Sequence, residues 1–137
     1  MSSTYFLDTN IISHMMLDGD GAAARRAIQV LAEQPDIDLC TSIVVQCELL
    51  YGLRKRPSPR LQRAFELQML GIKVVALDEA DAAIYASLRH TLESSGTPLG
   101  PNDLLIAAQA MRCEATLVSA DAAFARVPGL KLQNWLA

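Results

Sequence analysis

The chain has 137 residues and a formal net charge of −3, with 51% hydrophobic and 20% charged residues. This length and composition predict a single domain over residues 1–137 with a substantial apolar core. No stretch of 18 apolar residues occurs, and the N-terminus has no basic segment followed by an apolar one. We therefore expect neither a transmembrane helix nor a signal peptide.

Predicted strands and helices alternate along the chain. Short apolar or β-branched runs predict five strands, at residues 5–7, 37–40, 73–77, 115–119 and 130–132. Capping residues and helical spacing predict helices at residues 43–51, 60–70, 80–88 and 104–112, and a short helix after residue 121. This alternation predicts an α/β fold in three layers around a parallel sheet. In such sheets ligands bind beyond the carboxyl ends of the strands, where the strand order reverses.

Three aspartates occupy positions where such a pocket would form. Asp8 and Asp121 each follow a predicted strand, and Asp103 opens a predicted helix. Taken singly, each has an ordinary interpretation as a turn or capping residue, because aspartate favours both. Their common placement at one edge of the sheet is what suggests a site.

Glu48 is harder to explain structurally. It lies on an apolar face of its predicted helix, with Val44 and Val45 one turn before it and no Lys or Arg within a turn on either side. A buried carboxylate without a partner costs several kcal/mol. Either the Glu48 side chain reaches water or it belongs to a polar site.

The combined chemistry of these acids favours a hard metal ion. Converging carboxylates repel one another unless a cation is present, and oxygen ligands without His or Cys suit Mg²⁺ or Mn²⁺. Zinc is disfavoured, because His14 and His90 lack a second ligand at a suitable spacing and the three cysteines form no CxxC pair. Odd, unpaired cysteines indicate free thiols in a reducing cytoplasm. No GxSxG, GxxxxGK[ST] or GxGxxG motif is present.

Four ordered segments and the tail resemble the PIN domain, and in particular the VapC-type toxins of bacterial toxin–antitoxin pairs. The segments are Leu7-Asp8-Thr9-Asn10, Ser42 with Glu48-Leu49-Leu50-Tyr51-Gly52, Gly100-Pro101-Asn102-Asp103-Leu104-Leu105-Ile106-Ala107-Ala108, Leu117-Val118-Ser119-Ala120-Asp121, and Arg126-Val127-Pro128-Gly129-Leu130-Lys131-Leu132 with Trp135. The resemblance covers essentially the whole chain.

The resemblance implies a PIN fold, with about five parallel strands flanked by helices, and a Mg²⁺- or Mn²⁺-dependent endoribonuclease that acts on RNA such as tRNA or ribosomal RNA. It also implies a homodimer held inactive by a cognate VapB-type antitoxin. By the same resemblance, Asp8 and Asp103 are the metal ligands, and Glu48 and Asp121 complete the catalytic acids. The polar neighbours that would orient these carboxylates are Thr9, Asn10 and Ser119.

One position departs from the family pattern. The family often has Thr-Asn before or at the fourth acid, whereas this chain has Ser119-Ala120-Asp121. Ala120 therefore lacks the amide side chain that the asparagine of the family pattern would supply. Among the four acids, the role of Asp121 is therefore the least determined.

A basic segment directly follows the helix that carries Glu48. Residues 54–63 contain five of the twelve Lys and Arg residues and no acid. Arg54, Lys55 and Arg56 are candidates for contacts with RNA phosphates. The segment could equally be a solvated surface, or face the antitoxin or a second subunit.

Two other functions fit parts of the pattern. A receiver domain also places acids around Mg²⁺, but it requires an adjacent acidic pair and a Lys, and this chain has Asp8-Thr9-Asn10 and Ser119-Ala120-Asp121. A related Asp-x-Asp phosphatase would need an acid at Asn10. A non-catalytic PIN-like binding module usually loses some of its acids, whereas all four are present here.

Overall fold

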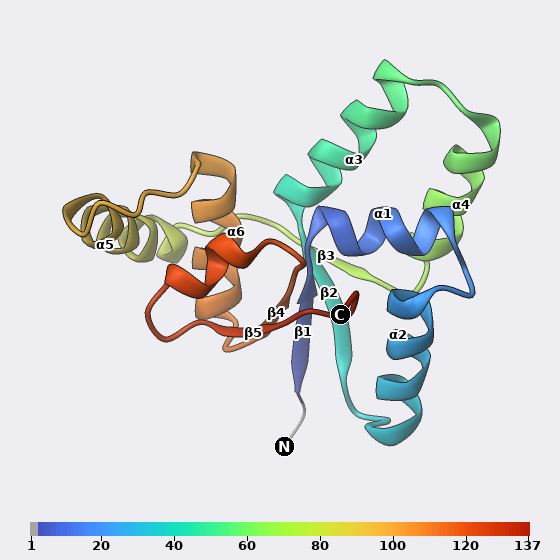
Figure 1. Cartoon of the computed structure of the whole chain (residues 1–137), viewed down its shortest axis with the longest axis horizontal. Coiled ribbons are helices and arrows are strands. Elements are labelled where there is room, and N and C mark those ends of the chain that lie inside the picture. Colours follow the sequence, from blue (N-terminus) through green and yellow to red (C-terminus); the bar gives the residue numbers. More distant parts are fainter. Residues whose placement is uncertain (1–2) are drawn as a thin grey trace.

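The computed structural model describes residues 3–137, and its centre is one sheet of five parallel strands in the order β3-β2-β1-β4-β5 (Figure 1). The strands are β1 (Thr4–Leu7), β2 (Asp38–Ser42), β3 (Lys73–Val75), β4 (Thr116–Val118) and β5 (Lys131–Gln133). All five predicted strands are present, so the predicted α/β fold is confirmed. The strand predicted at residues 73–77 ends two residues early.

Helices cover the sheet on both sides, with α1–α4 grouped on one side and α5 and α6 on the other (Figure 1). None of the helices within residues 3–137 is long and apolar enough to cross a lipid bilayer. The helices are α1 (Thr9–Leu17), α2 (Ala22–Glu33), α3 (Ile43–Lys55), α4 (Pro59–Met69), α5 (Ala80–Ser94), α6 (Pro101–Arg112) and the short 3₁₀ helix η1 (Ala122–Arg126).

Helices α1 and α2 lie between residues 9 and 33, where the sequence pattern predicted no element. The prediction stopped at Asp8-Thr9-Asn10 because these residues favour turns. In the structure Asp8 is instead the N-cap of α1, and its carboxylate accepts a hydrogen bond from the Thr9 amide at 2.8 Å. One residue therefore both ends a strand and begins a helix.

Strand β1 lies at the centre of the sheet and is covered on both faces. Tyr5, Phe6 and Leu7 are 7%, 1% and 1% exposed, so the strand has no solvent-facing side. Near the C-terminus Trp135 packs against Tyr5, with ring centroids 5.5 Å apart. Burial on both faces is typical of parallel sheets between helical layers.

The strand order reverses between β1 and β4. From β1 the chain continues to β2 and β3 on one side, whereas β4 and β5 lie on the other side. The carboxyl ends of β1 and β4 are therefore neighbours, and the Asp8 amide donates to the Val118 carbonyl at 2.9 Å. This is the position where an open α/β sheet forms its binding crevice.

Helices α5 and α6 are joined by a buried ion pair. The Arg112 guanidinium contacts Asp81, whose side chain is only 3% exposed, while the Arg112 side chain is 25% exposed. Asp81 also accepts from the Asp78 amide at 2.8 Å, and Arg112 donates to the Ala76 carbonyl at 3.4 Å. The pair thus anchors α6 to the segment after β3.

Replacing Arg112 by Met should leave the Asp81 carboxylate buried without its cation. We expect Arg112→Met to lower the free energy of unfolding by about 2–3 kcal/mol in urea denaturation, less than for a fully buried pair because Arg112 is partly exposed. The matched control is Arg89→Met, which removes an exposed ion pair with Glu93 and should cause no measurable change. Equal midpoints for the two variants would contradict a stabilising role of the buried pair.

Candidate active site

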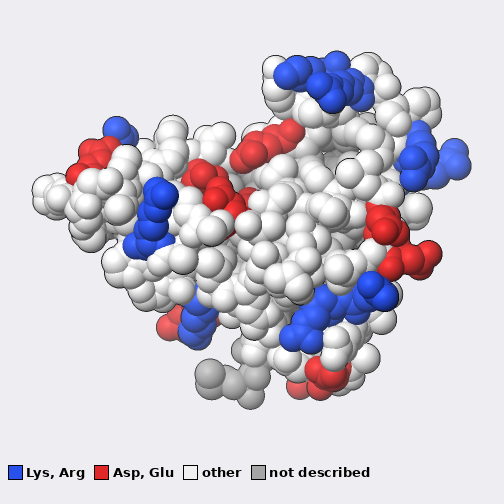
Figure 2. Space-filling view, viewed as in Figure 1, with Lys and Arg blue, Asp and Glu red and all other residues white. Residues whose placement is uncertain are grey.

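Four acidic residues from four separate segments face a hollow at the carboxyl edge of the sheet. Asp8 precedes α1, Glu48 lies in α3, Asp103 lies in the first turn of α6, and Asp121 precedes η1. In Figure 2 acidic side chains gather in the cleft between the α3 side and the α6 side of the molecule. The structure therefore brings together all four acids that the sequence singled out. Their catalytic roles stay predictions.

Asp8 is the most buried of the four acids, at 5% exposed. One carboxylate oxygen accepts from the Thr9 amide, and the other accepts from the Ser119 hydroxyl at 2.7 Å and from the Asn10 amide group at 3.3 Å. Burial raises the pKa of Asp8, these hydrogen bonds lower it in part, and the charge of Asp121 raises it further. The net pKa lies above its ordinary value, so the donors hold the carboxylate in place without fully offsetting its desolvation.

Ser119 and Asn10 connect the ends of β1 and β4. The Ser119 hydroxyl donates to Asp8 and accepts from the Asp121 amide at 3.0 Å. The Asn10 side-chain oxygen accepts from the amide of Ala120 at 3.1 Å. The amide side chain that Ala120 lacks is therefore not needed to tie this loop, because Asn10 binds its backbone.

Glu48 reaches the same hollow from α3. It is half-buried, and the Thr9 hydroxyl donates to its carboxylate at 3.3 Å. Burial raises the pKa of Glu48, the Thr9 hydrogen bond lowers it, and the charges of Asp8 and Asp103 raise it. Of the two interpretations left open by the sequence, the polar site accounts for these contacts.

Asp103 differs from the other acids because its carboxylate accepts no hydrogen bond from residues 3–137. Burial raises the pKa of Asp103, and the charges of Asp8 and Asp121 raise it further. This occurs in the first turn of α6, where the helix dipole itself favours a negative charge. Asp103 is thus a half-buried carboxylate whose oxygens are available to a cation.

Asp121 is exposed and has a structural role of its own. Its carboxylate accepts from the Ala123 amide at 2.9 Å and so caps η1. Its charge nevertheless acts on both Asp8 and Asp103. The capping interpretation and the electrostatic one both apply to this residue.

The donor set fits a hard divalent ion held mainly by water and two carboxylates. Within residues 3–137, no three Asp, Glu, His or Cys side chains are placed so that they could hold one ion together. Mg²⁺ commonly keeps several waters and takes only one or two carboxylates from the protein. Burial, and after it the repulsion between like charges, raises the pKa of Asp8, Glu48 and Asp103, and a bound cation would offset this negative charge.

An apolar groove of about 310 Å³ adjoins the acidic hollow. Its lining includes Thr9 and Glu48 from the hollow, Leu49 and Leu53 of α3, and Arg56. Arg54, Lys55 and Arg56 are all exposed at the end of α3. Figure 2 shows basic side chains at this tip, on the same face as the acidic hollow.

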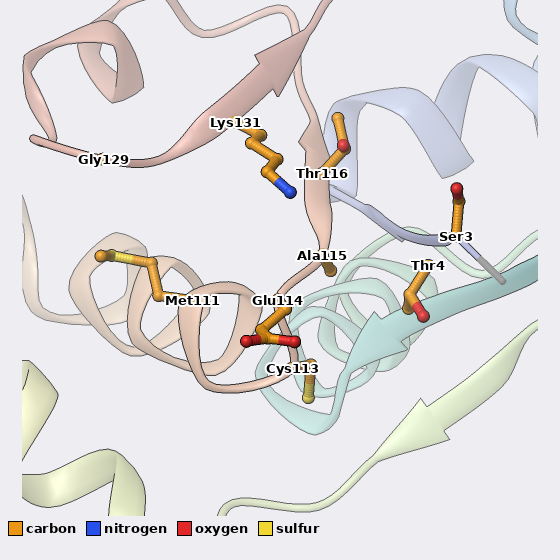
Figure 3. Close-up of a pocket in the computed structure, with 9 residues that line it drawn as sticks. All are labelled: Ser3, Thr4, Met111, Cys113, Glu114, Ala115, Thr116, Gly129 and Lys131. Atoms are coloured by element: carbon orange, nitrogen blue, oxygen red, sulfur yellow. The ribbon is translucent and has the colours of Figure 1, made fainter. Parts of the chain in front are cut away.

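A cavity of about 750 Å³ lies at the opposite edge of the sheet (Figure 3). It is lined by residues at the amino ends of strands, among them Thr4 and Thr116, and by Glu114 and Lys131. Its lining holds one acid rather than several, and its position is remote from the carboxyl ends where the other acids meet. Size alone therefore does not identify the site.

The raised pKa of Asp103 predicts how its removal should affect stability. Because the folded state holds the proton more tightly than the unfolded state, the contribution of this acid to stability falls as pH rises from about 3.8 through the raised pKa. We expect Asp103→Asn to raise the Tm of the metal-free protein by about 2–4 °C at neutral pH. The gain should shrink as the pH falls toward and below 3.8, where the Asp103 carboxyl takes up its proton in the unfolded state as well.

The matched control for this prediction is Asp36→Asn, which removes the charge of an exposed acid outside the hollow. We expect no pH-dependent gain in that variant. If Asp103→Asn lowered the Tm at neutral pH, the electrostatic account of the hollow would be wrong.

Comparison with known proteins assigns the family. The family model described as PIN domain matches residues 5–130. Ribonuclease VapC1 of Haemophilus influenzae is 32% identical over 133 residues, covering 96% of this chain and 97% of that protein. The tRNA(fMet)-specific endonuclease VapC of Salmonella typhimurium is 30% identical over 99 residues, covering 71% of this chain and 75% of that protein.

A solved structure agrees with these sequence relatives. VapBC2 from Rickettsia felis, bound to a DNA fragment from its promoter, contains a chain that matches with a TM-score of 0.87 and 30% identity. The match covers 96% of this chain and 98% of that one. Neither the receiver domain nor the non-catalytic module is favoured by these relatives. The chain belongs to the PIN domain family and, within it, to the VapC ribonucleases of toxin–antitoxin pairs.

Proposed function

We propose that this chain is an endoribonuclease toxin that hydrolyses RNA phosphodiesters with the help of Mg²⁺ or Mn²⁺ in the acidic hollow. The observation that carries the proposal is the convergence of four acids on one hollow, three of which have a raised pKa. Such a charge cluster destabilises the empty protein, so its presence points to a cationic ligand.

Each residue of the hollow has a definite task in this proposal. Asp8 and Asp103 would hold the ion, Asp8 in an orientation fixed by Ser119 and Asn10, and Asp103 through oxygens that accept no bond from residues 3–137. Such an ion lowers the pKa of water and stabilises charge on a phosphate. Burial raises the pKa of Glu48, which makes its carboxylate a stronger proton acceptor than an ordinary glutamate. Asp121 adds negative charge beside Asp8 and Asp103.

The first test is the effect of metal removal and of Asp8→Asn on cleavage of total RNA. We expect EDTA to abolish cleavage, Mg²⁺ or Mn²⁺ to restore it, and Asp8→Asn to lower the rate by at least about a hundredfold, because the ion loses a charged ligand. Asp36→Asn serves as the control and should cleave at the normal rate. Cleavage that survives both EDTA and Asp8→Asn would reject metal-dependent hydrolysis here.

We further propose that Arg54, Lys55 and Arg56 contact RNA phosphates. They are exposed at the end of α3, six to eight residues beyond Glu48, and Glu48 and Arg56 line the same groove. An RNA strand crossing the acidic hollow needs positive charge beside it, and the chain as a whole has a net charge of −3. This segment supplies such charge on the same face (Figure 2).

The second test replaces Arg54, Lys55 and Arg56 by Gln. We expect weaker RNA binding and a flatter dependence of log affinity on log salt, by about two to three units of slope, because fewer counterions are released. Arg25 and Arg26 lie on α2, away from the hollow, so their replacement by Gln is the matched control. An unchanged salt slope in the triple variant would assign the segment to another surface role.

The likeness to a VapBC complex supports a VapB-type antitoxin as the partner of this chain. The likeness to a tRNA(fMet)-specific enzyme makes tRNA one candidate substrate, with ribosomal RNA as another. A homodimer and a cytoplasmic location complete the proposal. The molar mass of the purified chain in solution, alone and with a co-expressed antitoxin, tests the homodimer and the toxin–antitoxin complex.

A further inference from the structure

We propose that Ser42 and Gln109 form a positioning clamp that sets the separation between Glu48 and Asp103. Among the sequence motifs Ser42 appears only in the family resemblance, and Gln109 appears in none. Both side chains are completely buried, at 0% exposed. Ser42 ends β2 and is the N-cap of α3, which carries Glu48, and Gln109 lies on α6, which carries Asp103. The inference rests on the proposed metal site, and its test separates the two.

The amide of Gln109 has all its hydrogen-bonding groups engaged. Its oxygen accepts a hydrogen bond from the Ser42 hydroxyl. Its NH₂ group donates to the carbonyls of Val75 and Ala76, at 3.0 and 3.1 Å. The same Ser42 oxygen accepts from the Val44 amide at 2.9 Å and so begins α3. One buried network therefore joins the start of α3, α6 near its C-terminal end and the end of β3.

Because the clamp lies some distance along each helix from the acid, a small change in the angle between the helices would shift the acids relative to each other. Ser42 lies six residues before Glu48, and Gln109 lies six residues after Asp103. Six helical residues span about 9 Å, so each acid is about 9 Å along its helix from the clamp. A tilt of about 10° between α3 and α6 would then move one carboxylate by about 1.5 Å relative to the other.

Packing alone does not account for a glutamine at this position. Its neighbours on α6 are apolar and buried, namely Ile106, Ala107, Ala108 and Ala110. A buried amide adds no net stability over a well-packed apolar side chain unless its partners need it, but it restricts the geometry of the groups that it joins. The groups joined here are the two helices whose acids interact electrostatically across the hollow.

The test measures the affinity of the purified protein for Mn²⁺ alone by calorimetry, with folding checked by thermal denaturation. The clamp holds α6, which carries the proposed ligand Asp103. We therefore expect Ser42→Ala and Gln109→Leu each to weaken Mn²⁺ binding by about tenfold or more, as for other residues that orient metal ligands. The double variant should be no weaker than the worse single variant, because each breaks the same clamp. Ser42→Thr, which keeps the hydroxyl, should bind Mn²⁺ within about twofold of the wild type.

The matched control is Ser58→Ala, which removes the side-chain cap of α4 without touching the clamp. It should lose a helix cap as Ser42→Ala does, but bind Mn²⁺ normally. If Gln109→Leu fails to fold, Gln109→Asn replaces it, because the shorter amide stays polar but cannot reach all three partners. Mn²⁺ affinity equal to wild type in folded Ser42 and Gln109 variants would overturn the clamp, whereas no Mn²⁺ binding by the wild type would overturn the metal site itself.

Discussion

The structure depends on one constraint, which is a carboxylate buried at the central edge of a parallel sheet. Asp8 is 5% exposed and lies where the strand order reverses, so water cannot solvate it freely. Its charge is supported instead by the Thr9 amide, the Ser119 hydroxyl and the Asn10 side chain. The same donors join the ends of β1 and β4. One set of hydrogen bonds thus holds these strand ends together and orients the Asp8 carboxylate.

The energetic cost of burying a carboxylate is not confined to Asp8, because two further acids lie close to it. Glu48 and Asp103 approach Asp8 from helices on opposite sides, and each has a raised pKa because burial and like charges act together. Strain of this kind is concentrated where a ligand relieves it, since natural proteins tolerate instability chiefly at functional sites. A divalent cation is the simplest ligand that would relieve it here, and RNA hydrolysis is the chemistry that the VapC relatives share by name.

Three residues of helix α6 connect the acidic hollow to the rest of the fold. Its first turn carries Asp103, Gln109 near its C-terminal end contacts Ser42 and the end of β3, and Arg112, its last residue, contacts Asp81. The spacing of these residues along one rigid helix means that the loop after β3 and the acidic hollow are mechanically connected. Through such an arrangement, buried polar side chains remote from the acids would orient the carboxylates of the proposed metal site.

By itself the sequence determined the five strands, the parallel α/β class and which four acids to consider. Strand periodicity, an aspartate after a strand or at a helix start, and a glutamate on an apolar helix face are all local patterns. It did not predict α1 or α2, since Asp8-Thr9-Asn10 reads as a turn until its role as a cap is seen. Only the tertiary structure decided that Asn10 binds the Ala120 amide, that Asp103 accepts no hydrogen bond from residues 3–137, and that Gln109 meets Ser42. These contacts join residues 67 to 110 positions apart, and no local pattern encodes which distant groups the packed helices bring together.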